Sequence, residues 1–309
     1  MSNIRQPQAM ARLTERFSLG TVHRSDRIIP AVKAFAFAAV FALSGAGHAM
    51  SQDQPTRVVS INLCTDQLAL MIAAPGQLIS VSRLAHDADS SSMVEQAKDL
   101  PTNGSGAEEI FLLKPDLVLA GTFTSPATVS LLRDLGIAVE QFAPASSLAD
   151  VPERLEQMGQ ALGQKEKAAI LAARYVADLA SLTAAQEETR PRAAITYVNN
   201  YSSGKGSLAG DILNVAGFDN VADEIGLSSV GRLALEDLVL LEPDVIIQGR
   251  NYPGAARAED NLNHAALRAL PETLMAGEIT DRDWICGTPQ VLKAVEAMRN
   301  LHLSMSAQK

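Results

Sequence analysis

The sequence predicts an α/β fold with two lobes, each built on a central, mostly parallel sheet, joined by one long backbone helix, with a ligand cleft between the lobes. Short apolar runs bounded by turn residues alternate with amphipathic stretches in two separate parts of the chain. This is typical of strands buried on both faces with helices between them. A long stretch with helical periodicity, 147–189, separates the two parts. A segment of 14 residues occurs in two similar copies, one in each part.

The first lobe is expected to span 50–146, after a secretory signal peptide at 1–49. Basic residues precede an apolar run at 34–43, and a small-residue stretch that ends at Ala49 follows it, which is the order of a signal peptide. The apolar run is shorter than the roughly 20 residues of a membrane-spanning helix. No cysteine lies near Ala49, so a lipid anchor is not expected. We therefore expect a soluble protein released into the periplasm. The long basic segment leaves open a start codon downstream of Met1.

Cleavage after Ala49 leaves an acidic chain. Residues 1–49 hold six of the 26 Lys and Arg residues and two of the 35 Asp and Glu residues, so 20 basic and 33 acidic groups remain, a net charge of −13. A surface of this charge disfavours nucleic acid and anionic lipid as partners. The protein is expected to be monomeric.

Apolar runs in the first lobe predict strands, and the amphipathic stretches between them predict helices. The expected strands are 57–62, 78–83, 115–121 and 137–142, and the expected helices are 65–73, 107–114 and 125–136. A linking region of helices, 147–190, follows and is broken near Gly163. Its second part, Lys165 to Thr189, lacks Gly and Pro and is long enough for a helix of about 37 Å.

The second lobe, 191–309, resumes the alternation after Pro191. Strands are expected at 192–200 and 243–249, helices at 208–217 and 233–242, and a further α/β stretch at 275–285. A closing helix is expected from Pro289 to about Met305.

The two similar copies are EEIFLLKPDLVLAG at 108–121 and EDLVLLEPDVIIQG at 236–249, with six identical positions at an offset of 128. Each copy predicts a short helix that stops before Pro, a turn at Pro-Asp and a buried strand that ends at Gly. This corner alone explains the repeated Leu, Pro, Asp and Gly residues. The first residues of the copies, Glu108 and Glu236, each stabilise their helix by about 0.3–1 kcal/mol through the helix dipole. The dipole does not explain why both copies have a glutamate at the same position.

These features together resemble the substrate-binding proteins of ABC importers that carry ferric siderophores, haem and cobalamin. The similarity covers about 56–305 and includes the Glu-x-[Ile/Leu]-x-x-Leu-x-Pro-Asp segment of each lobe. Smaller matches are Thr65-Asp66, similar to the family's Thr-Glu at the first helix; Gly204 to Gly210, similar to its glycine-containing cleft loop; and Arg282-Asp283-Trp284, similar to the Ser-Asp-Trp of cobalamin-binding members, whose Trp borders the ligand. The chain departs from the family at 62–66, which is one residue shorter and carries a cysteine.

The resemblance implies a function and a partner. The protein would capture a metal-chelate ligand (iron-siderophore, haem or cobalamin-type corrinoid) and deliver it to an ABC permease dimer in the inner membrane, with its ATPase, and it would need no cofactor of its own. Glu108 and Glu236 match the family's glutamates that dock into arginine pockets on the two permease halves. A carboxylate and a guanidinium can pair bidentately, which fixes orientation. The single linking helix predicts little closure on ligand binding.

Candidate ligand-binding residues follow the expected strands, because ligands of open α/β sheets sit beyond the carboxyl ends of the strands. They combine aromatic rings and cations, which suit a flat apolar ligand with anionic edges. The set is Cys64, Thr65, Arg83, Phe123, Tyr201, Arg250, Tyr252, Trp284 and Cys286. No catalytic residue and no metal ligand are expected.

Cys64 and Cys286 are the only cysteines, and one falls in a strand-end loop of each lobe. In an oxidising compartment a disulfide between them is the first expectation. Two free buried thiols, and two thiols that contact a ligand or a metal, remain open as alternatives.

Two other functions compete with capture of a chelate. A site for free Zn²⁺ or Mn²⁺ requires several converging His and carboxylate groups, whereas the mature chain has only His86, His264 and His302. An enzyme on a similar two-lobe fold is disfavoured, because the chain has no Gly-x-Ser-x-Gly, Gly-x-x-x-x-Gly-Lys-Ser/Thr or His-Glu-x-x-His motif;.

Overall fold

The computed structural model describes residues 54–183, 189–249, 260–268, 270, 273–279 and 281–307, which belong to one compact unit. The expected signal peptide at 1–49 and the candidates Arg250 and Tyr252 lie outside the described residues. Within the described ranges, no helix combines the length and the apolar character that crossing a membrane requires.

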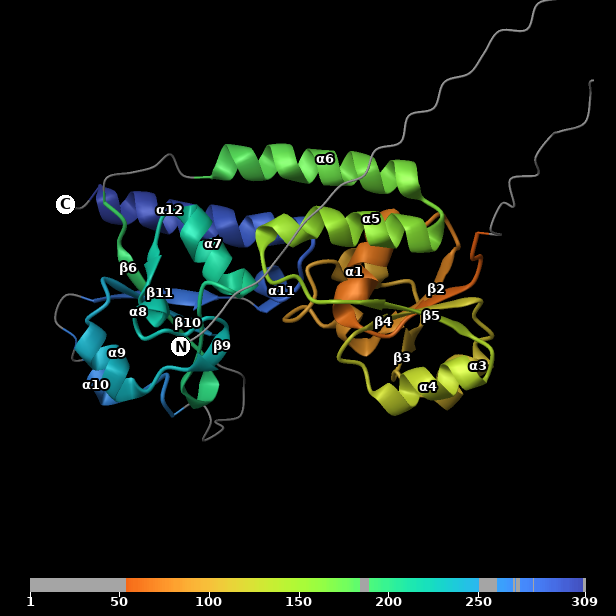
Figure 1. Cartoon of the computed structure of the whole chain (residues 1–309), viewed down its shortest axis with the longest axis horizontal. Helices are drawn as coiled ribbons and strands as arrows, with labels where there is room; N and C mark the ends of the chain where they lie inside the picture. Colours follow the sequence, from red (N-terminus) through yellow and green to blue (C-terminus); the bar gives the residue numbers. More distant parts are fainter. Residues whose placement is uncertain are drawn as a thin grey trace, which may run out of the picture. The chain divides into compact units, whose positions relative to one another are not determined.

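The first lobe is a five-stranded parallel sheet with helices on both faces (Figure 1). Its strand order is β3-β2-β1-β4-β5, where β1 is Val58–Ser60, β2 Leu78–Ser82, β3 Thr102–Asn103, β4 Leu117–Gly121 and β5 Ala138–Phe142. The helices are α1 (Leu63–Ile72), the 3-10 turn η1 (Arg83–His86), α2 (Val94–Ala97), α3 (Ala107–Leu112) and α4 (Pro126–Asp134). The four strands and three helices expected from the sequence are present.

The strands β1 and β4 are buried on both faces, because each face packs against helices. In β4, Leu117 and Leu119 belong to the core that also contains Leu68 of α1. The alternate residue Val118 belongs to a second core with Ile110 of α3. The face with α1 and the face with α3 are therefore opposite sides of one sheet.

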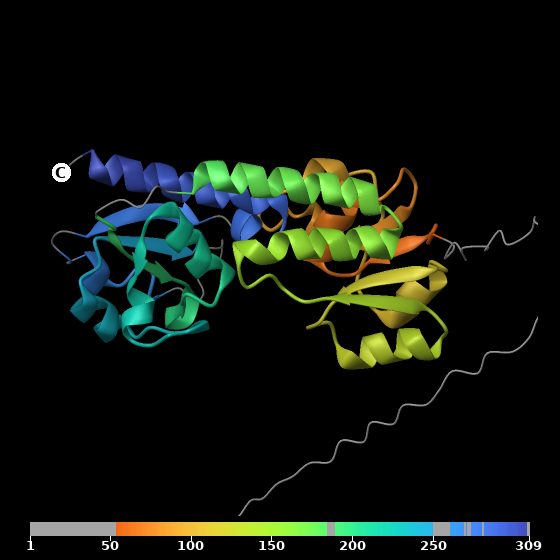
Figure 2. The same cartoon turned by 45° about the horizontal axis from the view of Figure 1, so that its top comes forward.

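The linking region is a 3-10 turn, η2 (Leu148–Asp150), and two helices, α5 (Val151–Leu162) and α6 (Lys165–Leu182), that pack against each other (Figures 1 and 2). Gly163, in the left-handed conformation at φ 69°, ends α5. The expectation of a helix from Lys165 to Thr189 is wrong in its length. The helix ends at Leu182, about 27 Å long;. Thr183 follows the helix in an extended conformation, with ψ of 127°, and its nitrogen and hydroxyl both donate to the Leu179 carbonyl (3.0 and 2.9 Å).

The second lobe contains a four-stranded parallel sheet and a two-stranded antiparallel ribbon. The sheet order is β11-β10-β6-β8, with β6 at Arg192–Thr196, β8 at Asp219–Asn220, β10 at Val245–Gly249 and β11 at Leu274–Ile279; the ribbon pairs β7 (Tyr201–Ser203) with β9 (Val230–Arg232). The helices and 3-10 turns are η3 (Val198–Asn200), α7 (Leu208–Ala216), α8 (Val221–Glu224), α9 (Leu235–Leu241), α10 (Ala265–Arg268), α11 (Asp281–Trp284), η5 (Pro289–Val291) and α12 (Leu292–Ser306). Ile246 of β10 packs with Leu238 of α9 on one face, and Ile247 belongs to the core of α7 and α12 on the other.

The repeated Pro-Asp corner makes the same hydrogen bond in both lobes. Asp116, before β4, accepts from the backbone nitrogen of Arg57 beside β1 (3.0 Å). Asp244, before β10, accepts from the backbone nitrogen of Arg192 in β6 (2.7 Å). Each aspartate thus ties the start of its strand to the neighbouring strand. The repeated Asp has a structural role that duplicates with the fold.

The arginines complete the corner. Arg57 donates to the Lys114 carbonyl (3.0 Å), and Arg192 donates to the Glu242 carbonyl (3.2 Å). Lys114 and Glu242 occupy aligned positions before the Pro-Asp pair, and both have left-handed backbones, with φ of 50° and 43°. This conformation is uncommon for residues with a side chain, so each lobe holds it with the same arginine bond.

Candidate functional site

Three adjoining hollows lie at the strand ends. The largest, about 570 Å³, is lined from both lobes: Phe123, Pro144, Ala145 and Ser146 from the first, and Tyr197, Ser203, Gly206, Ser207, Leu208, Ala209, Ser229, Val230, Trp284 and Ile285 from the second. A second hollow of about 410 Å³ includes Arg83, Asn103 and Ser105. A third of about 170 Å³ includes Thr65, Phe142 and Arg154. Ile285 lines all three, so they form one cleft region.

Exposed apolar side chains dominate the rim of this cleft. Phe123 is 89% exposed, Val230 62% and Ile285 50%. Phe123 lies in the turn after β4, where the Thr124 hydroxyl accepts a hydrogen bond from the Gly121 nitrogen (3.1 Å). This hydrogen bond fixes the backbone of the turn, and the Phe123 ring stays accessible to solvent at the rim of the cleft.

Cys64 and Cys286 form a disulfide in the structure, with a Cα–Cα distance of 5.1 Å. Cys64 is the second residue of α1, whose first turn is capped by Asn62. The Asn62 side-chain oxygen accepts from the nitrogens of Cys64 (3.0 Å) and Thr65 (3.4 Å). Cys286 follows α11 in the second lobe. Cys64 lines two of the hollows, so the disulfide lies at the cleft and crosses from one lobe to the other.

Two further contacts accompany the disulfide. The Thr288 hydroxyl donates to the side-chain oxygen of the buried Gln67 on α1 (3.4 Å). Gly287 lies against the loop after β5, since a Cβ at this position would come within 2.1 Å of the Ala145 Cβ. At Gly287 the chain therefore approaches the first lobe more closely than a residue with a side chain could.

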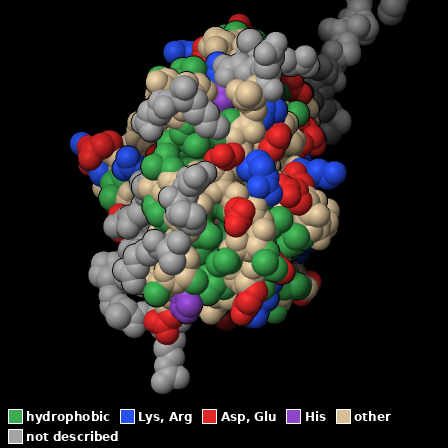
Figure 3. Space-filling view, turned by 90° about the vertical axis from the view of Figure 1, so that its left-hand side faces the viewer, with side chains coloured by type: hydrophobic (Ala, Val, Ile, Leu, Met, Phe, Trp, Pro, Cys, Tyr) green, Lys and Arg blue, Asp and Glu red, His purple; other side chains and the backbone are tan. Residues whose placement is uncertain are grey.

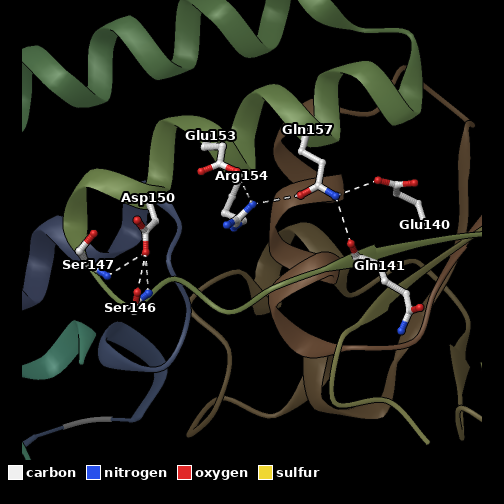
Figure 4. Close-up of polar contacts among 8 residues, drawn as sticks. All are labelled: Glu140, Gln141, Ser146, Ser147, Asp150, Glu153, Arg154 and Gln157. Atoms are coloured by element: carbon white, nitrogen blue, oxygen red, sulfur yellow. Dashed lines mark hydrogen bonds and ion pairs between the residues drawn. The ribbon is translucent and has the colours of Figure 1, made fainter. Parts of the chain in front are cut away.

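The loop from β5 to α5 forms one wall of the cleft and is fixed by Asp150 (Figure 4). Its carboxylate accepts from the nitrogen (2.7 Å) and hydroxyl (3.0 Å) of Ser146 and from the nitrogen of Ser147 (3.0 Å). Burial raises the pKa of Asp150, but these hydrogen bonds outweigh it and hold the pKa below its ordinary value. The carboxylate is therefore ionised at neutral pH and can accept all three hydrogen bonds.

Arg154 on α5, drawn in Figure 4 with its polar contacts, lines the smallest hollow and brings a cation to it. Its Nη1 contacts Glu153 (3.1 Å) and the Gln157 side-chain oxygen (3.2 Å). Gln157 in turn donates to Glu140 (2.8 Å) and to the Gln141 carbonyl (3.1 Å) on β5. Arg154 was not predicted as a cleft residue, because it lies within a helix and not at a strand end.

A buried carboxylate lies beneath the cleft. Asp66 of α1 is fully buried and accepts from the nitrogen (3.1 Å) and hydroxyl (2.5 Å) of Ser82 at the end of β2. Burial raises the pKa of Asp66, and the hydrogen bonds offset this only in part. This side chain positions the start of η1, where Arg83 lines the 410 Å³ hollow.

The structure brings most of the predicted residues to the cleft. Cys64, Thr65, Arg83, Phe123 and Trp284 line its hollows. The Thr65 hydroxyl is engaged by the Asn62 carbonyl (2.9 Å) and the Ser60 hydroxyl (2.8 Å). Arg250 and Tyr252 lie outside the described residues.

Tyr201 does not line these three hollows. Its ring lies beneath the Arg232 guanidinium, 5.7 Å from the ring centroid, across the β7–β9 ribbon. Tyr197, the first residue after β6, lines the cleft in its place. The strand expected at 192–200 ends earlier in the structure, at Thr196. A strand end placed there selects Tyr197 as the cleft candidate.

Two parallel α/β sheets whose strand ends meet at one apolar cleft define the class of two-lobe binding proteins. The sequence profile of the periplasmic binding protein family matches residues 58–264. The chain belongs to this family.

Curated relatives share part of the chain. The cobalamin-binding protein of Halobacterium salinarum is 28% identical over 200 residues, which cover 63% of this chain and 54% of that protein. The vitamin B12-binding protein of Pectobacterium atrosepticum is 24% identical over 254 residues, covering 78% of this chain and 86% of that protein. This chain thus spans about half the length of the Halobacterium relative.

Solved structures share the fold. The periplasmic heme-binding protein RhuT from Roseiflexus sp. RS-1 aligns with a TM-score of 0.67 at 21% identity, covering 79% of this chain and 96% of that one. The vitamin B12-binding protein BtuF of Vibrio cholerae aligns with a TM-score of 0.61 at 17% identity, covering 83% and 99%.

Proposed function

We propose that this chain is the extracytoplasmic substrate-binding component of an ABC importer, which captures a metal chelate in the cleft and presents it to a membrane permease. The observation that carries the proposal is the apolar rim drawn from both lobes, with Phe123, Val230 and Ile285 exposed around one cleft. A free metal ion would require charged ligands, and a sugar or amino acid would require a polar lining. Exposed rings and aliphatic side chains match a large, flat, apolar ligand.

Cations near this rim suit a ligand with polar or anionic edges. Arg83 is exposed in one hollow, and Arg154 reaches another. Relatives named for cobalamin, and similarly folded proteins named for haem and vitamin B12, support a macrocyclic metal chelate. With both cysteines in a disulfide, the proposed ligand is a chelate whose metal needs no thiolate from the protein.

A bare-metal site finds no support in the part of the chain that the structure describes. No three or more His, Cys, Asp or Glu side chains converge there as they would to hold an ion. His86 instead contacts the Ala97 carbonyl (2.9 Å), and His302 contacts Arg299 (3.0 Å). The family is one of binding proteins, which favours capture over catalysis.

The ligand is tested with the chain's single tryptophan. Trp284 lines the cleft and is 8% exposed, so a bound chromophore quenches its fluorescence. Cyanocobalamin, hemin and a ferric hydroxamate are titrated separately into purified protein. We expect saturable quenching by one of them, about tenfold weaker binding in Phe123→Ala, and unchanged binding in Phe111→Ala, a half-exposed ring on α3. A folded protein that none of the three quenches would refute chelate binding.

The permease is proposed to dock on the two repeated helices. Glu108 and Glu236 lie in the first turns of α3 and α9, and both are exposed. Among the described residues neither carboxylate has a hydrogen bond or an ion pair, whereas the adjacent Glu109 accepts from the Gly104 nitrogen (2.8 Å). Both carboxylates are therefore available to pair with guanidinium groups of a partner.

The docking role separates cleanly from ligand capture. Glu108→Gln with Glu236→Gln keeps shape and removes charge, so we expect intact quenching of Trp284 and a loss of ligand uptake into permease-containing proteoliposomes. Glu166→Gln is the matched control, because this residue is also exposed in the first turn of a helix, α6. Uptake that is unaffected by the double variant would count against docking through these glutamates.

A further inference from the structure

The repeated helices present a second matched feature beside their glutamates. Leu112 of α3 is 76% exposed and Leu240 of α9 is 81% exposed, the highest values among the large aliphatic side chains in the described ranges. The two residues occupy aligned positions in the two copies. Each follows its glutamate by four residues, so each Glu–Leu pair lies on one helix face.

This exposure corrects the sequence interpretation of the repeat. The corner was expected to account for all repeated leucines. Leu113 does pack against the core that contains Ile110 of α3. Leu241 likewise packs against the core that contains Leu238 of α9. Leu112 and Leu240 are identical in the two copies yet take no part in that packing.

We propose that Leu112 and Leu240 are the apolar centres of two equivalent docking surfaces, each beside its glutamate, that receive the two halves of the permease dimer. This inference rests on the proposed function, and it adds an apolar contact to the ion pairs proposed for the two glutamates. A single exposed leucine is ordinary on a protein surface. Two that are aligned in a duplicated segment, and more exposed than any other large aliphatic side chain described, fit a partner that is itself duplicated.

The energetics favour an apolar centre. An exposed ion pair contributes about 0–1 kcal/mol and is screened by salt, so two glutamates alone give a weak contact at physiological ionic strength. Interfaces gain most from side chains that become fully desolvated at the centre of the contact, with charges around them that set orientation. The arrangement of one leucine and one carboxylate on each helix has this form.

The two surfaces occupy comparable places in their lobes. α3 and α9 each cover the sheet face opposite the one that packs against α1 or against α7 and α12, and both lie away from α6 in Figure 1. Figure 3 shows the end of the molecule at the left of Figure 1, where hydrophobic side chains lie among acidic and basic ones. A partner that approaches from the α3 and α9 side meets neither linking helix.

The test measures binding of the purified full chain, with and without its chelate, to the permease–ATPase complex in nanodiscs. Leu112→Ser and Leu240→Ser are each expected to weaken binding about tenfold, and the double variant about a hundredfold. Glu108→Gln and Glu236→Gln are run in parallel at 50 and 300 mM salt. The glutamate effect should shrink at high salt, while the leucine effect should persist. Ile170→Ser, a 63% exposed residue on α6, is the matched control and should bind as wild type.

The outcomes distinguish the inference from the function. Leucine variants that bind as wild type, with glutamate variants impaired, would overturn the docking leucines and leave the proposed function standing. An effect of only one leucine would overturn the equivalence of the two surfaces. Concentration-dependent self-association that the double variant abolishes would reassign them to a dimer of this chain. Wild type that binds its chelate but never the permease would overturn both proposals.

Discussion

Removal of the Cys64–Cys286 disulfide should cost a large part of the stability of this protein. The two cysteines are 222 residues apart, and the chain-entropy relation for a loop of that length gives about 5 kcal/mol at 25 °C. This is an upper value, since residual structure in the unfolded chain reduces it, and we expect a loss of about 2–5 kcal/mol in the free energy of unfolding.

Urea unfolding followed by Trp284 fluorescence measures this loss. The perturbation is Cys64→Ser with Cys286→Ser, and Cys64→Ala with Cys286→Ala separates the cross-link from the polarity of the new side chains. Wild type with reductant should lose a similar amount. A double variant within about 0.5 kcal/mol of wild type, together with a non-reduced peptide map that lacks the Cys64–Cys286 peptide, would refute the reasoning.

The same variants test how far the cleft can open. Because the disulfide crosses the lobes beside the Gln67–Thr288 hydrogen bond, wild type should change little in radius of gyration when the ligand binds. The double Ser variant should show a larger ligand-dependent decrease in solution scattering. A large decrease in wild type would contradict a restrained cleft.

Two further predictions concern single residues. Asp116→Asn should destabilise the folded chain by about 1 kcal/mol at pH 7, a value reduced for the exposure of the carboxylate. Burial raises the pKa of Asp116, but hydrogen bonds from Thr56 and Arg57 outweigh it and hold the pKa below its ordinary value of 3.8. The contribution is therefore present above pH 3.8 and disappears as the pH falls through the lower folded-state value. The gap between wild type and variant in thermal unfolding should therefore narrow as the pH falls below 3.8, and a gap that widens would contradict this reasoning. Gly287→Val should lower stability by about 1–3 kcal/mol through contact with Ala145;, and unfolding curves identical to wild type would argue against the close approach.

Much of the fold could be predicted because parallel strands buried on both faces leave continuous apolar runs in the sequence. Such runs marked β1, β2, β4, β5, β6 and β10. The strands β3 and β8 were not predicted, since two residues carry no periodicity. The end of α6 was missed because the absence of Gly and Pro permits a helix without requiring one, and the backbone becomes extended at Thr183.

Phe123 could be predicted because it follows a strand end. Trp284 is the last residue of α11, and its place in the cleft was also indicated by the resemblance of Arg282-Asp283-Trp284 to the family's Ser-Asp-Trp segment. Arg154 was missed because it reaches the cleft from a helix, and Tyr197 was missed through a boundary error of a few residues. The Arg57–Asp116 bond joins residues 59 apart, and nothing in either local sequence indicates the other.

The disulfide also gives the chain the connectivity of a ring with two tails. Residues 64–286 form a covalently closed loop that contains most of both lobes. A protease in an extracytoplasmic compartment that cuts once anywhere within this loop produces two ends but no separate fragment. A molecule that is cut once can thus keep both halves of its cleft covalently joined. Separation of the two halves would require a second cut or reduction of the disulfide.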